Sequence, residues 1–207
     1  MSLIQGIITE DFILVGYNMT DSLPTPVFKP NRQIIIGCDG NFSDTAKLLE
    51  GHCSFNEESG FHALEEEIPF SYTDFISIIE ERFASMQNDH EDPNSDAKYN
   101  ISTIICGHNG KEFEISIFTL GRESLAPNGV IKAKKVSTLP YQGITLGDPL
   151  HSKNLHTLVH TYYHTYKDMT LLKYKHLLQD VFEAGMVSDH SIQGYIAYEK
   201  IRKNDLK

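Results

Sequence analysis

The sequence predicts a mixed α+β fold in which strands come in consecutive groups and helices come in pairs. Apolar runs at 4–8, 12–17 and 32–38 are short and bounded by polar turns, which is typical of strands. Two later regions change to the apolar spacing of amphipathic helices, and further strands follow each of them. Because strands joined by short turns pair antiparallel, we expect two mainly antiparallel sheets. One arrangement stacks the sheets face to face with the helices outside.

The first helical region is predicted over residues 43–68. Ser43 is the expected N-cap, and apolar residues recur at helical spacing after it. Gly51 and the polar stretch NEESG at 56–60 are positions where this helix can be interrupted.

A second helix is predicted over residues 71–86, where apolar side chains form one stripe. Ser71 and Asp74 resemble a capping box at its start, with aspartate in place of the usual glutamate. The polar stretch 87–98 has no periodicity and is predicted to be a loop.

The second half opens with a hairpin signal. Strands are predicted at 101–108 and 112–120, and the Asn109-Gly110 pair between them is a strong turn signal. The remaining predicted elements are a loop at 121–135, a strand at 136–147, helices at 152–169 and 170–185, and a strand at 191–201.

Length, composition and charge narrow the class of protein. The chain has 207 residues, which favours a single domain over 1–207. Its formal net charge of −10 argues against sequence-independent binding of nucleic acid, although the KAKK run at 132–135 leaves room for a local basic patch. The sequence contains no run of about 18 apolar residues, so no membrane span is expected. It shows no secretory signal either.

The cysteines indicate a reducing compartment. Cys38, Cys53 and Cys106 are odd in number, unclustered and set in or beside apolar segments, so we expect buried free thiols and a cytoplasmic location. Burial would raise the pKa of such thiols and leave them unreactive.

Four segments carry a resemblance that spans nearly the whole chain. They are SLIQGIITEDFILVGYN, RQIIIGCDGNFSDTAKLL, STIICGHNGKEFEISIFTLGRE and the stretch from ITLGDP to YEKI. In this order they resemble the opening strand pair, the strand, turn and first helix, the central hairpin and the closing part of the proteasome β-subunit family. That family belongs to the N-terminal nucleophile (Ntn) hydrolases. The resemblance implies a four-layer αββα sandwich and a homo-oligomer.

The resemblance also implies positions for the catalytic residues. Ser2 falls at the position of the N-terminal threonine nucleophile, once the start methionine is removed. Asn18 stands where the family has an aspartate, and Pro26 stands where it has a lysine. Lys29 lies three residues further on, so an extended strand would turn its side chain to the opposite face unless a bulge intervenes. Asp189 matches the late aspartate that supports the N-terminus, whereas the late supporting serine is missing from TLGD.

The missing aspartate, lysine and serine make proteasome-type catalysis unfavourable. Removing members of a catalytic unit costs about 10³–10⁶ in rate. We therefore expect a proteasome-subunit-like protein without proteasome-type proteolysis that acts as an oligomeric binding or assembly protein. The alternative is an active amide hydrolase that uses Ser2 or the native N-terminal residue as nucleophile and its own amine as base. Ser2 can equally be an inert terminal residue.

Other motifs are less specific. His156, His160 and His164 would form a row on a helix, and two imidazoles four residues apart can bind a metal ion. No carboxylate or thiolate accompanies them locally, so a polar helix flank is favoured over a metal-dependent enzyme. The GCDGN stretch at 37–41 lacks the following basic residue of a phosphate-binding loop. No cofactor and no metal are expected, and the substrate is not indicated.

Overall fold

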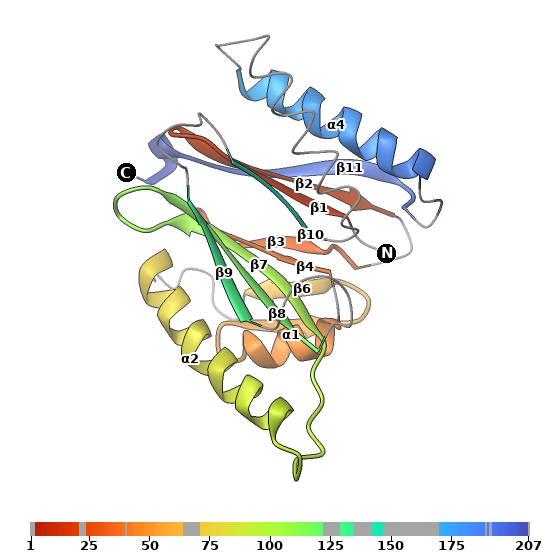
Figure 1. The fold of residues 1–207 in the computed structure, drawn as a ribbon. Coiled ribbons are helices and arrows are strands. Elements are labelled where there is room, and N and C mark those ends of the chain that lie inside the picture. Colours follow the sequence, from red (N-terminus) through yellow and green to blue (C-terminus); the bar gives the residue numbers. More distant parts are fainter. Residues whose placement is uncertain are drawn as a thin grey trace.

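The computed structural model describes residues 3–20, 24–39, 41–63, 71–121, 129–134, 142–146, 170–188, 190 and 192–206. Two antiparallel sheets face one another, and helices lie on their outer sides (Figure 1). The predicted mixed α+β architecture with mainly antiparallel sheets is confirmed. None of the helices in the described part of the chain is long and apolar enough to cross a membrane.

The first sheet has four strands in the order β10-β1-β2-β11. The turn between β1 and β2 is closed by Thr9, whose backbone N–H donates to the carbonyl of Phe12 at 2.9 Å. The Thr9 hydroxyl oxygen also accepts the N–H groups of Asp11 and Phe12. The strand bounds are β1 Ile4–Ile8, β2 Phe12–Met19, β10 Gln142–Leu146 and β11 Tyr195–Arg202.

The second sheet has five strands in the order β3-β4-β7-β8-β9. The predicted Asn-Gly hairpin joins β7 to β8, and Gly110 takes a φ of 91° there. Only a residue without Cβ adopts such a left-handed conformation readily. The strand bounds are β3 Val27–Asn31, β4 Ile34–Cys38, β7 Ile101–His108, β8 Phe113–Leu120 and β9 Gly129–Lys134.

Helices and a small hairpin cover the outer faces of the sheets (Figure 1). Helices α1 (Phe42–Leu48) and α2 (Tyr72–Glu91), with the hairpin of β5 (Cys53–Asn56) and β6 (Gly60–Ala63), pack on the five-stranded sheet. Helix α4 (Leu171–Ser188) packs on the four-stranded sheet through an apolar cluster of its own. A short 3-10 helix, η1 (Lys203–Leu206), follows β11.

The inner faces of the two sheets share one apolar core. Ile4, Ile8 and Val15 from the four-stranded sheet pack with Ile35 and Ile104 from the five-stranded sheet, and all five side chains are buried. The sequence encodes this core as isoleucine-rich runs, which fit the pleated and fully buried surface between two sheets.

The structure corrects the predicted helix over 43–68. Helix α1 stops early, and residues 53–63 form the β5–β6 hairpin instead. Gly51 follows the helix with a φ of 80°, a left-handed conformation that favours glycine beyond a helix end. The Asn56 side chain accepts two backbone N–H groups, at 2.8 and 3.3 Å, and so closes the hairpin turn. The polar stretch is therefore a turn between strands and not a break within a helix.

Helix starts were predicted with mixed success. Asn41, and not Ser43, caps α1, because its Oδ1 accepts the N–H groups of Ser43 and Asp44 while its own backbone is still extended. Ser71 does cap α2, since its hydroxyl oxygen accepts the Asp74 N–H at 3.1 Å. Both caps satisfy N–H groups that a helix leaves without internal partners.

Helix α2 continues beyond its predicted end at residue 86. The region 87–91 is helical and not a loop, and Gln87 donates to the Glu91 carboxylate one turn later at 2.8 Å. The helix ends at Glu91, and its C-cap Asp92 is extended because Pro93 follows. An exposed last turn carries no apolar periodicity, so the sequence pattern did not reveal it.

Two edge strands were missed, and one predicted helix cannot be judged. β3 contains Pro30, which an edge strand tolerates because proline has no N–H to donate to a neighbouring strand. β9, at the other edge, occupies part of the predicted loop 121–135. β4 starts at Ile34, two residues later than predicted, because residues 32–33 form a turn. The predicted helix at 152–169 lies outside the described residues.

The contact between α2 and β7 yields a stability prediction. A Cβ added at Gly107 would lie 2.1 Å from a ring carbon of the buried Tyr72. Gly107→Ala should therefore lower the free energy of unfolding by about 1–3 kcal/mol, since a close-packed ring can shift only at a cost. Urea unfolding measures the loss. In a Tyr72→Ala background the same substitution should cost much less, and an equal cost in both backgrounds would contradict the contact.

Candidate functional site

The candidate site lies where β1 begins, β2 ends and β11 begins. Of the four residues predicted to take part in catalysis, Asn18 and Lys29 fall in the described part of the chain. Ser2 and Asp189 lie outside it. Leu3, the neighbour of Ser2, is only 1% exposed, so the chain enters the protein core one residue after the predicted nucleophile.

Asn18 links three segments of the chain through its side-chain amide. Its Oδ1 accepts the backbone N–H of Leu3 at 2.6 Å, and its Nδ2 donates to the carbonyl of Gln193 at 3.2 Å. Its backbone N–H also donates to the Leu3 carbonyl at 3.2 Å. Asn18 is 6% exposed. An ionised aspartate could accept the first of these hydrogen bonds but could not donate the second.

Gly194 lets the segment before β11 approach the end of β2. It adopts a φ of 95°, and an added Cβ would lie 1.8 Å from the carbonyl oxygen of Met19. The preceding Gln193 therefore presents its carbonyl to Asn18. Sequence reasoning missed both of these residues. A glycine just before an alternating strand was the available signal, since such positions often need a left-handed backbone.

Lys29 is placed away from Asn18. Its ammonium donates to the carbonyl of Lys200 at 2.9 Å. Lys200 lies opposite Leu14 in the β2–β11 register, whereas Asn18 lies opposite Ile196. The two positions are four residues apart along the strand, about 13 Å at the usual strand rise. The register of β3 does shift between residues 28 and 31, as a bulge would require. Even so, the Lys29 side chain binds the Lys200 carbonyl on the edge strand β11 and does not reach the Asn18 amide.

Tyr17, beside Asn18, is buried and stays protonated. Burial, with smaller effects from Glu199 and Tyr195, raises the pKa of Tyr17 to about 12. A phenol in this state does not act as a base near pH 7. The tyrosine therefore contributes packing between the sheets, where it joins the inner apolar core.

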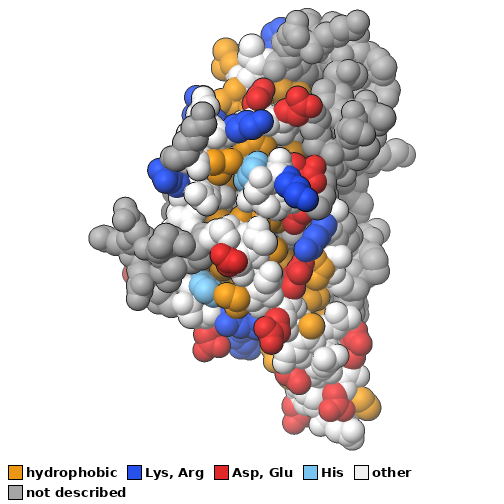
Figure 2. All heavy atoms as spheres, turned by 90° about the vertical axis from the view of Figure 1, so that its left-hand side faces the viewer, with side chains coloured by type: hydrophobic (Ala, Val, Ile, Leu, Met, Phe, Trp, Pro, Cys, Tyr) orange, Lys and Arg blue, Asp and Glu red, His pale blue; other side chains and the backbone are white. Residues whose placement is uncertain are grey.

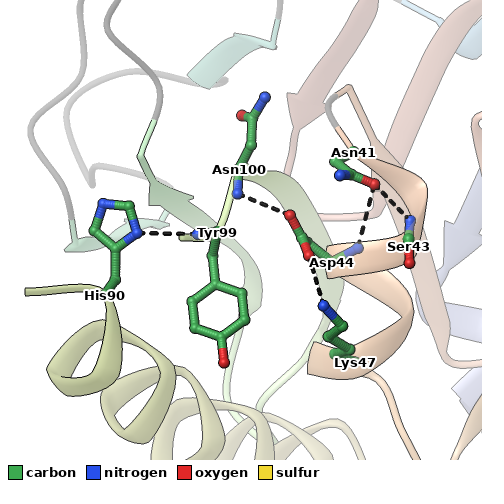
Figure 3. Close-up of polar contacts among 7 residues, drawn as sticks. All are labelled: Asn41, Ser43, Asp44, Lys47, His90, Tyr99 and Asn100. Atoms are coloured by element: carbon green, nitrogen blue, oxygen red, sulfur yellow. Dashed lines mark hydrogen bonds and ion pairs between the residues drawn. The ribbon is translucent and has the colours of Figure 1, made fainter. Parts of the chain in front are cut away.

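A buried carboxylate fixes the first turn of α1 (Figure 3). Asp44 accepts the backbone N–H of Asn100 at 3.0 Å through Oδ2 and pairs with Lys47 through Oδ1 at 3.1 Å. Asn41 caps the same helix start. The carboxylate thus ties α1 to the segment that leads into β7.

The same view shows how the segment between α2 and β7 is anchored (Figure 3). His90, in the last turn of α2, accepts the backbone N–H of Tyr99 through Nδ1 at 3.0 Å. Gly121 packs on both, because an added Cβ would lie 1.9 Å from the Tyr99 carbonyl oxygen. These contacts assign His90 a structural role.

The predicted buried thiols are confirmed, since Cys38, Cys53 and Cys106 are all free and buried. Burial raises the pKa of Cys53 to about 12 and raises that of Cys106 well above its usual range. Both therefore stay protonated near pH 7 and are poor nucleophiles. Cys38 lies 3.1 Å from the hydroxyl of Thr45, inside a buried polar contact with Thr103.

A second buried polar cluster lies between α2 and β8. The Tyr72 hydroxyl donates to Glu114 Oε1 at 3.2 Å and lies 3.0 Å from the hydroxyl of Ser116. Glu114 is only 3% exposed. Burial raises the pKa of Tyr72 well above its usual range, so the phenol remains a donor. Sequence reasoning missed this cluster, although a glutamate inside the apolar run FEISIF was a signal for it.

No metal site emerges from the described residues, because no three His, Cys, Asp or Glu side chains come together there as ligands. The predicted row of His156, His160 and His164 lies outside them. Comparison with the sequence profiles of known protein families gives no match, and no curated protein matches the chain either.

The Asn18 contacts yield a prediction about pH. Asn18→Asp should lower the free energy of unfolding by about 1–3 kcal/mol at pH 7, because a buried carboxylate would face the Gln193 carbonyl. Burial should raise the pKa of the new carboxyl, so the penalty grows as pH rises through the range between the unfolded and folded pKa values. Urea unfolding at pH 4 and pH 7 tests this. A penalty that is equal at both pH values would show that the amide is not held as described.

Proposed function

We propose that this chain is a divergent proteasome-β-subunit-like protein that lacks proteasome-type proteolysis and acts as an oligomeric binding or assembly protein. The observation that carries the proposal is the use of Asn18. At the position where the family resemblance expects an acid, an amide cross-links Leu3, the end of β2 and Gln193. The side chain at this position thus stabilises the fold.

The arrangement of layers supports the family part of the proposal. Helix α4 covers the four-stranded sheet, the two sheets pack through an inner core, and α1 and α2 cover the five-stranded sheet. This order agrees with the four-layer αββα sandwich of the Ntn hydrolases (Figure 1). β1 also begins at the terminus that would carry the nucleophile in that fold.

Acid–base chemistry supports the non-proteolytic part. A serine hydroxyl is a weak nucleophile near pH 7 unless neighbouring groups activate it. The side chain of Asn18 neither takes up nor releases a proton in that range. The ammonium of Lys29 is bound to the carbonyl of Lys200 in β11, four residues along that strand from the position that pairs with Asn18. Neither residue therefore serves the expected catalytic role.

Exposed apolar side chains on α4 support the oligomeric part. Leu172 is 62% exposed and Val187 is 81% exposed, on the helix that forms the outer layer over the four-stranded sheet. The helical repeat places them about 60° apart around the helix axis, so they share one side. Aliphatic side chains on one side of an outer helix suit contact with another subunit. The buried free thiols fit a reducing location such as the cytoplasm.

Covalent labelling tests the absence of catalysis. Protein with its native N-terminus is incubated with an electrophile that reacts only with a hydroxyl and α-amine on one residue, with an active proteasome as positive control. Intact-mass analysis should show no adduct, because Asn18 and Lys29, the residues expected to assist the terminal hydroxyl, are engaged in structural hydrogen bonds. An adduct on the first residue would instead establish the amide-hydrolase alternative. N-terminal sequencing adds an independent check, since a retained methionine excludes Ser2 as nucleophile.

Light scattering tests the oligomer. The wild-type protein should elute as a defined oligomer, and the Leu172→Glu, Val187→Glu double variant should shift toward monomer because two charges replace apolar contacts. Ile78→Glu on α2 is the matched control. It also charges a partly exposed aliphatic side chain, 41% exposed, but on the opposite outer layer. A monomeric wild type, or equal effects of both sets of substitutions, would refute an α4 interface.

A further inference from the structure

The turn between β7 and β8 arranges several groups around the side chain of Asn109. The backbone N–H of Gly110, the next residue, donates to His108 Nδ1 at 3.1 Å. The backbone N–H groups of Lys111 and Glu112 donate to Asn109 Oδ1 at 3.1 and 3.0 Å. The nitrogen that follows the asparagine therefore faces a base, and the side-chain carbonyl oxygen faces two donors.

The amide nitrogen of the same side chain is also held. Asn109 Nδ2 donates to Glu114 Oε2 at 3.3 Å. The other oxygen of this buried carboxylate accepts the Tyr72 hydroxyl. The three atoms of the Asn109 carboxamide thus lie in a fixed orientation at the tip of the hairpin.

An asparagine followed by glycine can react with its own backbone. The nitrogen of the next residue attacks the side-chain carbonyl carbon and forms a five-membered imide ring, which needs a base for the attacking N–H and donors for the developing oxyanion. We propose that this turn is a self-modification site, at which His108 removes the proton from the Gly110 amide and Asn109 loses its side-chain amide group. This inference does not depend on the proposed function.

The proton of the Gly110 nitrogen moves to His108 Nδ1 as the nitrogen bonds to the Asn109 side-chain carbon. The negative charge on Oδ1 is stabilised by the two backbone N–H groups. The bond from that carbon to Nδ2 then breaks, and the leaving nitrogen takes the proton from His108 and departs as ammonia. Water opens the ring to aspartate or isoaspartate, and nothing is oxidised or reduced.

His108 is in the right state for this role. Burial lowers its pKa, Lys203 of η1 lowers it further, and Glu112 opposes them. The ring of Phe113 lies edge-on to the imidazole, with 5.0 Å between ring centroids. The imidazole is therefore neutral near pH 7, and its Nδ1 already accepts the N–H that it would deprotonate.

Water reaches the turn. Gly110 and Lys111 are exposed, and the hairpin tip lies on the side of the molecule where the chain ends (Figure 1). Figure 2 shows this side, where side chains of both charges lie among histidine and hydrophobic ones. Hydrolysis of the imide needs no opening of the fold.

The product would change the contact between the hairpin and α2. A new carboxylate at position 109 would face Glu114, which the Asn109 amide now bonds. Two carboxylates at this distance repel each other, more so away from water. The modification should thus weaken the hold of Glu114 on Tyr72 and, through it, on α2.

Comparison of folded and denatured protein tests the proposal. Both samples are incubated at about pH 7, where His108 is neutral. Peptide mass spectrometry follows the conversion of Asn109. The folded protein should convert Asn109 at least about tenfold faster, because general-base catalysis contributes at least that much. Asn128, the other asparagine that precedes a glycine, is the reference in the denatured sample. A rate in the folded protein no higher than in the denatured chain would mean that the turn protects Asn109, and the proposal would be wrong.

Two further measurements separate His108 from the turn itself. His108→Asn keeps a hydrogen-bond acceptor but removes the base, so Asn109 should react at least about tenfold more slowly. In the wild type, the rate should level off once His108 is neutral, whereas hydroxide alone gives about a tenfold rise for each pH unit. A steady rise across neutral pH would overturn the role of His108 even where the variant folds poorly.

Discussion

The close approach of the two sheets is the constraint on which the rest of this structure depends. Ile4 of β1 packs onto Gly37 of β4, where an added Cβ would lie 3.2 Å from the isoleucine Cδ1. The missing side chain at Gly37 leaves room for the isoleucine, and the surrounding inner-face residues fill the remaining space. Because β1 is held between β2 and β10 in its sheet, this packing fixes Ile4 and the rest of β1 within the protein. The buried position of Leu3 follows directly.

Asn18 and Lys29 are best understood together. A buried carboxylate is tolerated where a cation pairs with it, and it is costly where none does. The register of the edge strand β3 directs Lys29 toward the Lys200 carbonyl, far from the end of β2. With the cation elsewhere, a neutral amide is the side chain that satisfies both the Leu3 N–H and the Gln193 carbonyl. The neutral amide at position 18 and the placement of Lys29 near Lys200 are thus physically compatible with each other.

Much of the fold could be predicted because the inner strands carry a strong local signal. The runs at 4–8 and 101–108 are rich in isoleucine, and the strands there match the prediction. Edge strands and turns were harder. β3 begins with Val27 and Phe28 but continues with Lys29, Pro30 and Asn31. Asn56 closes a turn that composition alone did not distinguish from a break in a helix. The site was less predictable still. Asn18 could be singled out from the sequence as a candidate site residue. The contacts of Lys29 could not be predicted, because they depend on strand register, which only the pairing of distant segments determines.

The outer layer follows the same logic with polar groups. At Gly107 the five-stranded sheet has no side chain, and the Tyr72 ring of α2 occupies the space. Its hydroxyl then meets Glu114, so the helix is attached by a hydrogen bond to a buried charge as well as by apolar contact. A buried carboxylate needs every partner it has, because each lost hydrogen bond leaves charge without compensation. The Asn109 amide is one of those partners. A change of this side chain would therefore also affect the contact of Glu114 with Tyr72, which attaches α2 to the sheet.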